Sequence, residues 1–261
     1  MTPVAPAMVS IVTGPDREAR VEAATLVAGR YGECRTRDGA DVDIDALVAR
    51  LDDVARAHPG EAIALGIDDA LEPADVGLAL HSALAARDSA ALPMHLRDVV
   101  AVVSDREVRR ILHPHRDHGD GTSLQRVATR IEYATAVIVT GRAPARAADL
   151  ANALNPRAPI LLADRPRSIE PDRFRRLIRP PVDDLATEQG WMLALDGRTL
   201  RHADGVEVVV FRDPRPFHPG RLATVIARCL TPEHAGVIWR SRGVMRLATR
   251  PGQVGSWSSV G

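Results

Sequence analysis

The chain has 261 residues, an apolar fraction of 45% and a formal net charge of zero, with 34 acidic and 34 basic residues. This composition is typical of a soluble globular protein, and the zero net charge excludes a bulk electrostatic drive toward nucleic acid or anionic membranes. All 34 basic residues are arginines, because lysine is absent. GC-rich coding is the simplest cause, although arginine also favours bidentate contacts to carboxylate and phosphate groups.

The chain has two cysteines, Cys34 and Cys229, and nothing suggests a disulfide framework, which fits a reducing cytosol. Residues 1–13 lack the basic and long apolar regions of a signal peptide. No apolar run reaches membrane-spanning length. We therefore expect a cytoplasmic protein with no membrane partner and no sequence-specific DNA binding.

Apolar runs alternate with helical patterns over the first two thirds of the chain. Strands are predicted at 8–13, 62–67, 99–103, 135–140 and 159–163. Helices are predicted at 16–27, 43–57, 73–86, 123–134 and 144–154. This alternation is typical of a doubly wound, mostly parallel α/β sheet.

A charged, proline-rich stretch over residues 164–184 indicates a linker, with a short helix at 172–178. We place a domain boundary near Pro180, which gives an α/β domain over 1–180 and a smaller α+β module over 181–261.

The smaller module is predicted to be strand–helix–strand–strand. Val206 to Phe211 is a β-branched, apolar run that predicts a buried strand, and Pro219 lies where an N1 proline opens a helix. Residues 236–242 and 244–250 predict two strands that meet in a tight turn at Gly243. Cys229 falls in the predicted helix, where we expect it to face the core.

Three segments of this module form a specific combination. They are Arg215-Pro216-Phe217-His218-Pro219, the Gly-Val-Ile-x-x-x-x-Gly run from Gly236 to Gly243, and Leu-Ala-Thr-Arg-Pro at 247–251 followed by Trp257. Together they resemble the C-terminal domain of the CobW family of P-loop GTPase-type metal chaperones. Since the family's domain continues past the tryptophan with further strands, the resemblance implies an incomplete sheet with an exposed edge.

Two segments of the α/β part also resemble this family. Arg130-Ile131-Glu132-Tyr133-Ala134 is similar to the family's Gln-Ile-Glu-Phe-Ala, and Asn155-Pro156-Arg157-Ala158-Pro159-Ile160 is similar to its Asn-Pro-x-Ala-x-Ile. The resemblance implies a P-loop NTPase-like sheet and a role in zinc or cobalt homeostasis.

The phosphate-binding motif of such GTPases is degenerate here. The first strand should lead into G-x-x-x-x-G-K-[ST], whose amides and lysine hold phosphates and whose hydroxyl binds Mg²⁺. Gly14 matches the first glycine, but Ala19 replaces the second, Arg20 the lysine and Val21 the hydroxyl residue. Arg20 can contact a phosphate, whereas Val21 cannot bind a metal. Asp16 adds a charge that opposes a triphosphate, so we expect this loop to be structural.

The guanine-specificity motif, Asn/Thr-Lys-x-Asp, is also degenerate. After the strand at 135–140 the chain reads Thr140-Gly141-Arg142-Ala143, without the aspartate that accepts from guanine. Gly14, Arg20 and Thr140 are thus the remnants of a nucleotide site. We expect neither GTP nor Mg²⁺ to bind, and we interpret the chain as a pseudo-GTPase with no catalytic residues.

The family's Cys-x-Cys-Cys metal motif is reduced to Cys34, and one thiol cannot form a multi-thiolate zinc site. A second candidate is the polar loop at 113–120, where imidazoles and carboxylates suit Zn²⁺. Its candidate ligands are His113, His115, Asp117, His118 and Asp120. The alternative is a solvated polar loop, which the charge of Arg116 favours. His218 can be a ligand or a base, but a hydrogen bond to backbone before its helix is the expected role.

The missing lysine and the retained C-terminal signature resemble an actinobacterial CobW-like subgroup with eroded P-loops, implicated in recruiting a hibernation factor to the ribosome in zinc starvation. The resemblance implies a non-catalytic adaptor whose partners are a protein, the ribosome or a hibernation factor. Two alternatives stay open. One is a zinc metallochaperone with residual GTP binding and a metal on the histidine loop, and the other is a scaffold partner of a complete CobW paralogue.

Overall fold

The computed structural model describes residues 6–28, 30–34, 43–67, 71–87, 94–112, 121–142, 144–178, 206–229 and 238–260. The proposed boundary near Pro180 lies outside these residues. In this part of the chain no helix is both long enough and apolar enough to cross a membrane.

Six strands form one parallel sheet in the order β2-β3-β1-β4-β5-β6, which confirms the predicted α/β class. The strands are β1 (Ala7–Thr13), β2 (Arg30–Cys34), β3 (Ile63–Ile67), β4 (Met94–Ser104), β5 (Ala136–Thr140) and β6 (Ile160–Ala163). Strand β2 was not predicted, because it is a five-residue edge strand without a continuous apolar run. It contains Cys34, opposite Ile67 of β3.

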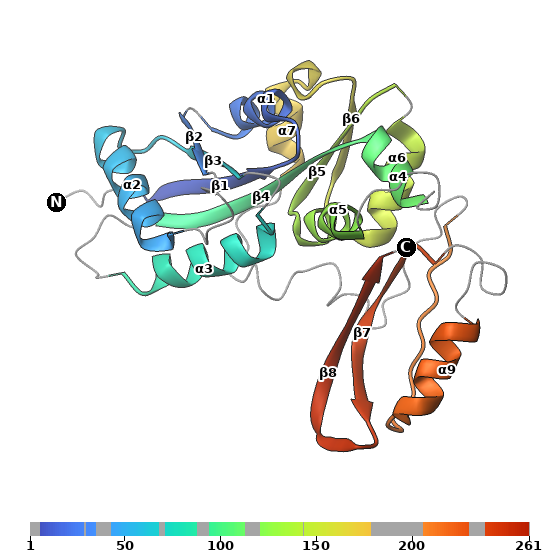
Figure 1. Cartoon of the computed structure of the whole chain (residues 1–261). Helices are drawn as coiled ribbons and strands as arrows, with labels where there is room; N and C mark the ends of the chain where they lie inside the picture. The colour runs from blue at the N-terminus through green and yellow to red at the C-terminus, as the bar shows by residue number, and fades with distance from the viewer. Residues whose placement is uncertain are drawn as a thin grey trace.

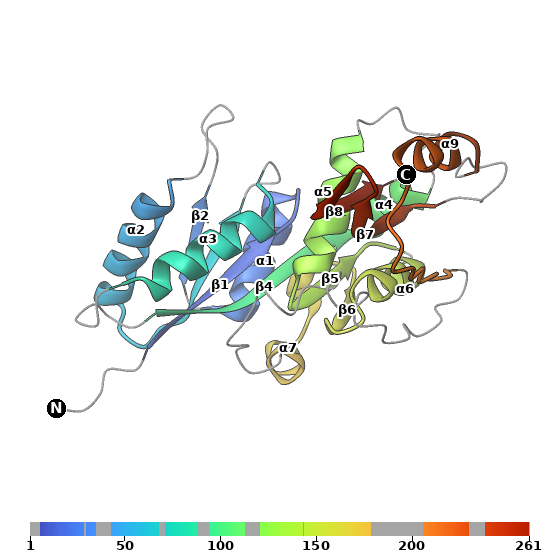
Figure 2. The ribbon, with the colours of Figure 1, turned by 90° about the horizontal axis from the view of Figure 1, so that it is seen from below.

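Helices cover both faces of this sheet (Figures 1 and 2). One face carries α1 (Arg17–Val27) and α7 (Pro171–Leu177), with the short 3₁₀ turn Pro166–Ser168 beside α1. The other carries α2 (Ile44–Ala57), α3 (Pro73–Ala85), α4 (Asp105–Leu112), α5 (Gly121–Tyr133) and α6 (Pro144–Leu154).

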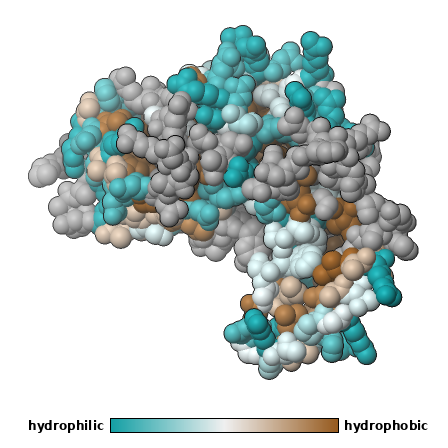
Figure 3. All heavy atoms as spheres, viewed as in Figure 1, coloured by the Kyte–Doolittle hydropathy of each residue, from teal (hydrophilic) through white to brown (hydrophobic). Residues whose placement is uncertain are grey.

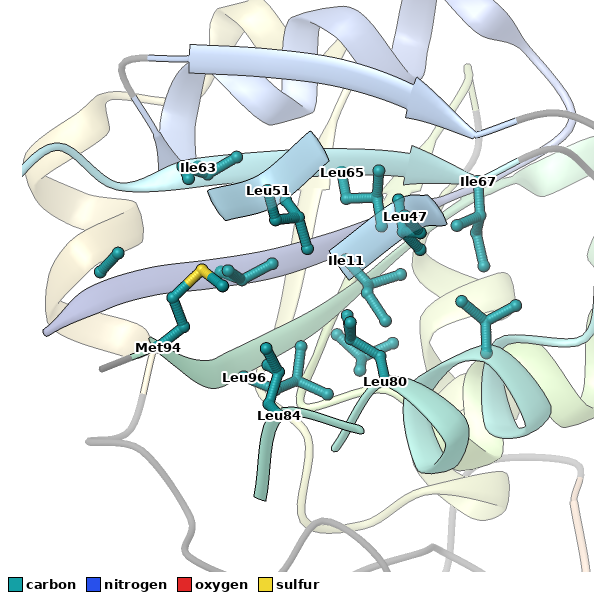
Figure 4. Packing of buried hydrophobic residues seen from close by; sticks show 14 of the residues in the cluster. Ile11, Leu47, Leu51, Ile63, Leu65, Ile67, Leu80, Leu84, Met94 and Leu96 are labelled. Carbon is teal, nitrogen blue, oxygen red and sulfur yellow. The ribbon is translucent and has the colours of Figure 1, made fainter. Parts of the chain in front are cut away.

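The strand period of two divides the core between the faces. Val9 and Ile11 of β1 belong to the cluster under α2 and α3, whereas Val12 belongs to the cluster under α1 and α7. Figure 4 shows Leu51 of α2 and Leu80 of α3 packed over the strands of the first cluster. Both faces are therefore sealed by buried aliphatic side chains.

The C-terminal module projects from the α/β layer (Figure 1). It contains α9 (Pro219–Cys229) and an antiparallel hairpin of β7 (Arg240–Leu247) and β8 (Arg250–Val260). The helix begins at Pro219, as predicted. The turn does not lie at Gly243, which pairs with Trp257 inside the ladder. The chain reverses after Leu247, which pairs with Arg250, so the predicted turn position was wrong.

Two further predictions for the module were wrong. Val206–Phe211 is not a buried strand, since Val209 is 80% and Phe211 71% exposed. The extended segment from Val206 to Phe217 bridges β7 at Phe217, opposite Leu247. Cys229 is exposed and does not face a core, because none of the residues of α9 is fully buried.

Candidate functional site

The order of the strands places a candidate ligand site at the carboxyl ends of β1 and β4. From β1 the chain adds β3 and β2 on one side, and then it crosses to β4, β5 and β6 on the other. Doubly wound sheets bind ligands beyond the strand ends where the order reverses in this way. We call the segments at these ends the loop edge: Gly14–Arg20, Ser104–Glu107 and Thr140–Gly141.

Gly14 follows β1 directly and lies against β4. A Cβ atom at this position would be 2.7 Å from the carbonyl oxygen of Val102. Only glycine fits there without a backbone shift. The agreement of Gly14 with the phosphate-binding motif thus has a packing cause that involves no nucleotide.

The first turn of α1 is capped by the protein's own carboxylate. Asp16 is the N-cap residue, and its Oδ1 accepts hydrogen bonds from the backbone N–H groups of Glu18 at 2.8 Å and Ala19 at 3.4 Å. Free N–H groups at this place are what a phosphate-binding loop offers to its ligand. Two of these donors are already used, by a group whose negative charge repels phosphate.

Arg20, at the position of the motif's lysine, is turned into the protein. It is 4% exposed, and its Nη1 donates a hydrogen bond to the carbonyl oxygen of Gly14. Arg130 of α5 lies in the same electrostatic neighbourhood: burial, and secondly the charge of Arg20, lowers the pKa of Arg130 to about 10. The guanidinium of Arg20 thus fastens the loop to its own helix.

The carboxyl ends of β4 and β5 are filled by polar side chains in a similar way. Ser104 and Glu107 form a capping box at the start of α4, with the Ser104 N–H donating to Oε2 of Glu107 at 2.9 Å and the Glu107 N–H to Oγ of Ser104 at 3.1 Å. The other oxygen of Glu107 pairs with Arg130 at 3.2 Å. These carboxylate oxygens are engaged within the fold.

Thr140 and Gly141 end β5, where guanine recognition would lie in a GTPase. Thr140 Oγ1 donates to the carbonyl oxygen of Val103 at 3.4 Å. Gly141 has a φ of +128°, and a Cβ there would collide with the carboxyl group of Asp105. Asp105 is itself 6% exposed and paired with Arg109 at 2.7 Å. Gly14 and Arg20 are in contact, while Thr140 lies two strands away from them.

The loop edge therefore does not fit Mg²⁺–GTP. Its helix N-terminus holds Asp16, its basic residue is bonded to the loop, and Val21 at the metal position has no hydroxyl.

The predicted zinc ligands of the loop at 113–120 lie outside the described residues. Within the described part of the chain, no group of three or more His, Cys, Asp or Glu side chains is arranged to hold a metal ion.

The Arg-Pro-Phe-His-Pro signature performs a structural task. The N–H of Phe217 donates to the carbonyl of Arg246 at 2.8 Å, and the carbonyl of Phe217 accepts from Ala248 at 2.9 Å, which joins the segment to the hairpin turn. His218 Nδ1 accepts from the backbone N–H of Arg221 at 3.4 Å, which confirms the expected helix-capping role. Arg215 pairs with Asp213 at 2.7 Å and lowers the pKa of that exposed carboxyl to about 2.

Glu132 joins the α/β layer to the C-terminal hairpin, a role that the sequence did not predict. Its carboxylate accepts from Arg240 at 2.8 and 2.9 Å and also pairs with Arg242. All three side chains are at least 88% buried. Burial lowers the pKa of Arg242, and the charge of Glu132 opposes this shift. One carboxylate thus pairs with two guanidinium groups at the joint.

Neighbouring groups hold this joint in place. Arg240 also donates to Oγ of Ser258 at 2.8 Å, and Arg242 to the carbonyl of Leu154 at 3.1 Å. The buried amide of Asn155 donates to the carbonyls of Ile131 at 2.9 Å and Ala134 at 2.8 Å. The two upstream segments noted in the sequence thus support one another at the end of α5. The signal for Glu132 was a charged residue between apolar neighbours.

Residues 206–261 match the family model described as the cobalamin synthesis protein CobW C-terminal domain. No curated protein matches the chain. Among solved structures it is similar to the "Crystal structure of Zn(II)-bound YjiA GTPase from E. coli", with 14% identity, a TM-score of 0.43, and coverage of 98% of this chain and 90% of that chain. The matched segment contains the signature, α9 and the hairpin, so residues 206–261 are similar to the CobW C-terminal domain.

Proposed function

We propose that this protein is a non-catalytic, CobW-like adaptor of the zinc-limitation response, which brings a protein partner such as a hibernation factor to the ribosome. The observation that carries the proposal is the state of the loop edge. In a GTPase this loop would hold phosphates. Here the carboxylate of Asp16 accepts hydrogen bonds from two backbone N–H groups of the loop, and Arg20 donates a hydrogen bond to the carbonyl oxygen of Gly14.

Hydrolysis of a nucleotide needs a cation for the β and γ phosphates and a hydroxyl for Mg²⁺. The first is unavailable because Arg20 is buried and turned toward Gly14, and the second is lacking because position 21 is valine. What remains is a well-packed α/β layer and a projecting module with exposed apolar side chains. Exposed apolar side chains of this kind mark protein interaction surfaces, which suits an adaptor.

Sedimentation tests this function. The purified chain is centrifuged through a sucrose cushion with purified ribosomes, with and without the hibernation factor, in zinc-replete and zinc-chelated buffer. We expect the chain to pellet with ribosomes and to increase the amount of factor in the pellet when zinc is removed. A chain that stays in the supernatant under every condition would refute the ribosomal adaptor, and nucleotide hydrolysis by the chain would refute its non-catalytic character.

A further inference from the structure

The outer edge of β8 is an unusually unprotected sheet edge. In the described part of the chain β8 pairs with β7 on one side, and no strand pairs with its other side. The strand has 11 residues, and residues 252–260 contain neither a charged residue nor a proline. Natural edge strands are usually short, or carry charges, prolines or bulges that prevent a further strand from adding. The charge and the proline of β8, Arg250 and Pro251, both lie at its first two positions, and the register shift of the ladder lies near the same end, so residues 252–260 have no sequence protection.

Zero net charge conceals a strong asymmetry along the chain. Residues 206–261 contain eight arginines and three acidic residues, a net charge of +5, which leaves −5 for residues 1–205. Arg240 and Arg242 are nearly buried and pair with Glu132, but Arg221, Arg228 and Arg250 are exposed. Residues 206–261 are thus a basic segment, whereas residues 1–180 have 24 arginines and 26 acidic residues, a net charge of −2.

Apolar side chains lie on the hairpin as well. Val244 is 55% and Val254 60% exposed. Arg240, Arg242 and Val244 alternate along β7 and so share a face. The first two dock on Glu132, and the face then continues into the exposed valine. Figure 3 shows brown, apolar residues in the projecting module between white and teal ones. The exposed part of this face therefore lies next to the buried contact between the hairpin and Glu132 of α5.

These features discriminate between possible occupants. The exposed valines of the hairpin, Val244 and Val254, cannot stack on bases, which argues against single-stranded RNA at this face. A second copy would bring two basic segments 206–261, each of net charge +5, together at this edge, and this repulsion argues against self-pairing. A strand with apolar and acidic side chains fits the open backbone, the valines and the arginines together.

We propose that the outer edge of β8 is a strand-addition site for an acidic, apolar segment of a protein partner. This deepens the adaptor function proposed above, because it assigns the surface that holds the partner. Backbone hydrogen bonds along β8 supply affinity, and Arg250, at the start of the strand, selects carboxylates.

The test uses the full chain and fluorescein-labelled nine-residue peptides, with binding followed by fluorescence anisotropy. The first peptide alternates valine and glutamate, the second alternates valine and arginine, and the third is the first N-methylated throughout. We expect the first to bind, and the other two to bind at least about tenfold more weakly, because one has the wrong charge and the other cannot donate backbone hydrogen bonds.

Two matched charge reversals locate the site. Arg250→Glu lies on β8 and should weaken binding of the valine–glutamate peptide about tenfold, whereas Arg228→Glu lies on α9 and should change it less than about twofold. Equal effects of the two variants would overturn the assignment to β8.

Further results would overturn the proposal. They are no binding of the acidic peptide, equal binding of its N-methylated form, tighter binding of a labelled single-stranded RNA, or a dimer of the wild-type chain in sedimentation that Arg250→Glu leaves intact and that excludes the peptide. If the peptides fail but the chain still sediments with ribosomes, the strand-addition site alone is refuted. If the peptides bind and sedimentation fails, the ribosomal adaptor is refuted and the site stands.

Discussion

The α/β layer and the C-terminal module differ in how deeply they bury similar apolar residues. Phe174 of α7 is fully buried beneath the sheet, while Phe211 of the module is 71% exposed. The layer has three clusters of buried apolar residues, whereas α9 has no buried residue. The difference teaches that apolar residues with strand or helix propensity form a core only where an opposing layer covers them.

The largest expected effect comes from breaking the joint between the two regions at Glu132. Glu132→Gln leaves Arg240 and Arg242 almost buried without their counter-charge, which should lower the free energy of unfolding by about 3–5 kcal/mol, or detach the hairpin from α5. Denaturant unfolding measures the first result, and limited trypsin digestion at the module's arginines measures the second. Glu170→Gln, at an exposed position, should cost less than about 0.5 kcal/mol. Equal stability and digestion of the two variants would show that Glu132 does not join the regions.

Cavity-forming substitutions compare the cores directly. Leu80→Ala, in the fully buried cluster between α3 and the sheet, should cost about 3 kcal/mol. Val225→Ala in α9, where the valine is 45% exposed, should cost less than about 1 kcal/mol. Denaturant titrations of both variants provide the numbers. A larger loss for Val225→Ala would mean that α9 packs against something in solution.

The cap of α1 should give a smaller effect. Asp16→Ala removes the side chain that accepts from Glu18 and Ala19, and it should lower the free energy of unfolding by about 1 kcal/mol. Thermal unfolding followed by circular dichroism measures the loss, and Asp16→Asn, which retains a capping oxygen, should restore most of it. No difference between the alanine and asparagine variants would contradict the capping role.

The last effect concerns Tyr133 and appears only at high pH. Burial, and secondly the charge of Asp75, raises the pKa of Tyr133 to about 12. An unfolded tyrosine ionises near 10, so the neutral form stabilises the fold below pH 10, and this contribution is lost as the pH rises from about 10 to 12. With two tyrosines in the chain, an ultraviolet absorbance titration of wild type and Tyr133→Phe isolates this group. Ionisation of Tyr133 near pH 10 in the folded protein would contradict its burial.

Much of the α/β layer was predictable because its elements are locally determined. The predicted helix at 144–154 coincides with α6, and Asp16 caps α1 where the pattern placed the helix start. Strand β2 was not predicted, because an edge strand needs no continuous apolar run. The run Val206–Phe211 misled the prediction, since β propensity describes fit to a sheet, and residues 207–211 are not part of a strand.

The candidate site shows the same division. The missing lysine and metal-binding hydroxyl are visible in the sequence at Arg20 and Val21, but the inward turn of Arg20 is not. The joint at Glu132 also could not be predicted, because its partners Arg240 and Arg242 are more than 100 residues away in the chain. Contacts of this kind depend on the tertiary arrangement, which no local pattern encodes.

Isothermal titration calorimetry with Mg²⁺–GTP, with and without one equivalent of Zn²⁺, tests the central claim most directly. Asp16 already accepts a hydrogen bond from the loop's backbone, and Arg20 already donates one to the carbonyl oxygen of Gly14. We therefore predict no detectable heat of nucleotide binding under either condition. Micromolar binding would contradict the account, and its loss in Arg20→Ala would show that this guanidinium leaves Gly14 to hold a phosphate.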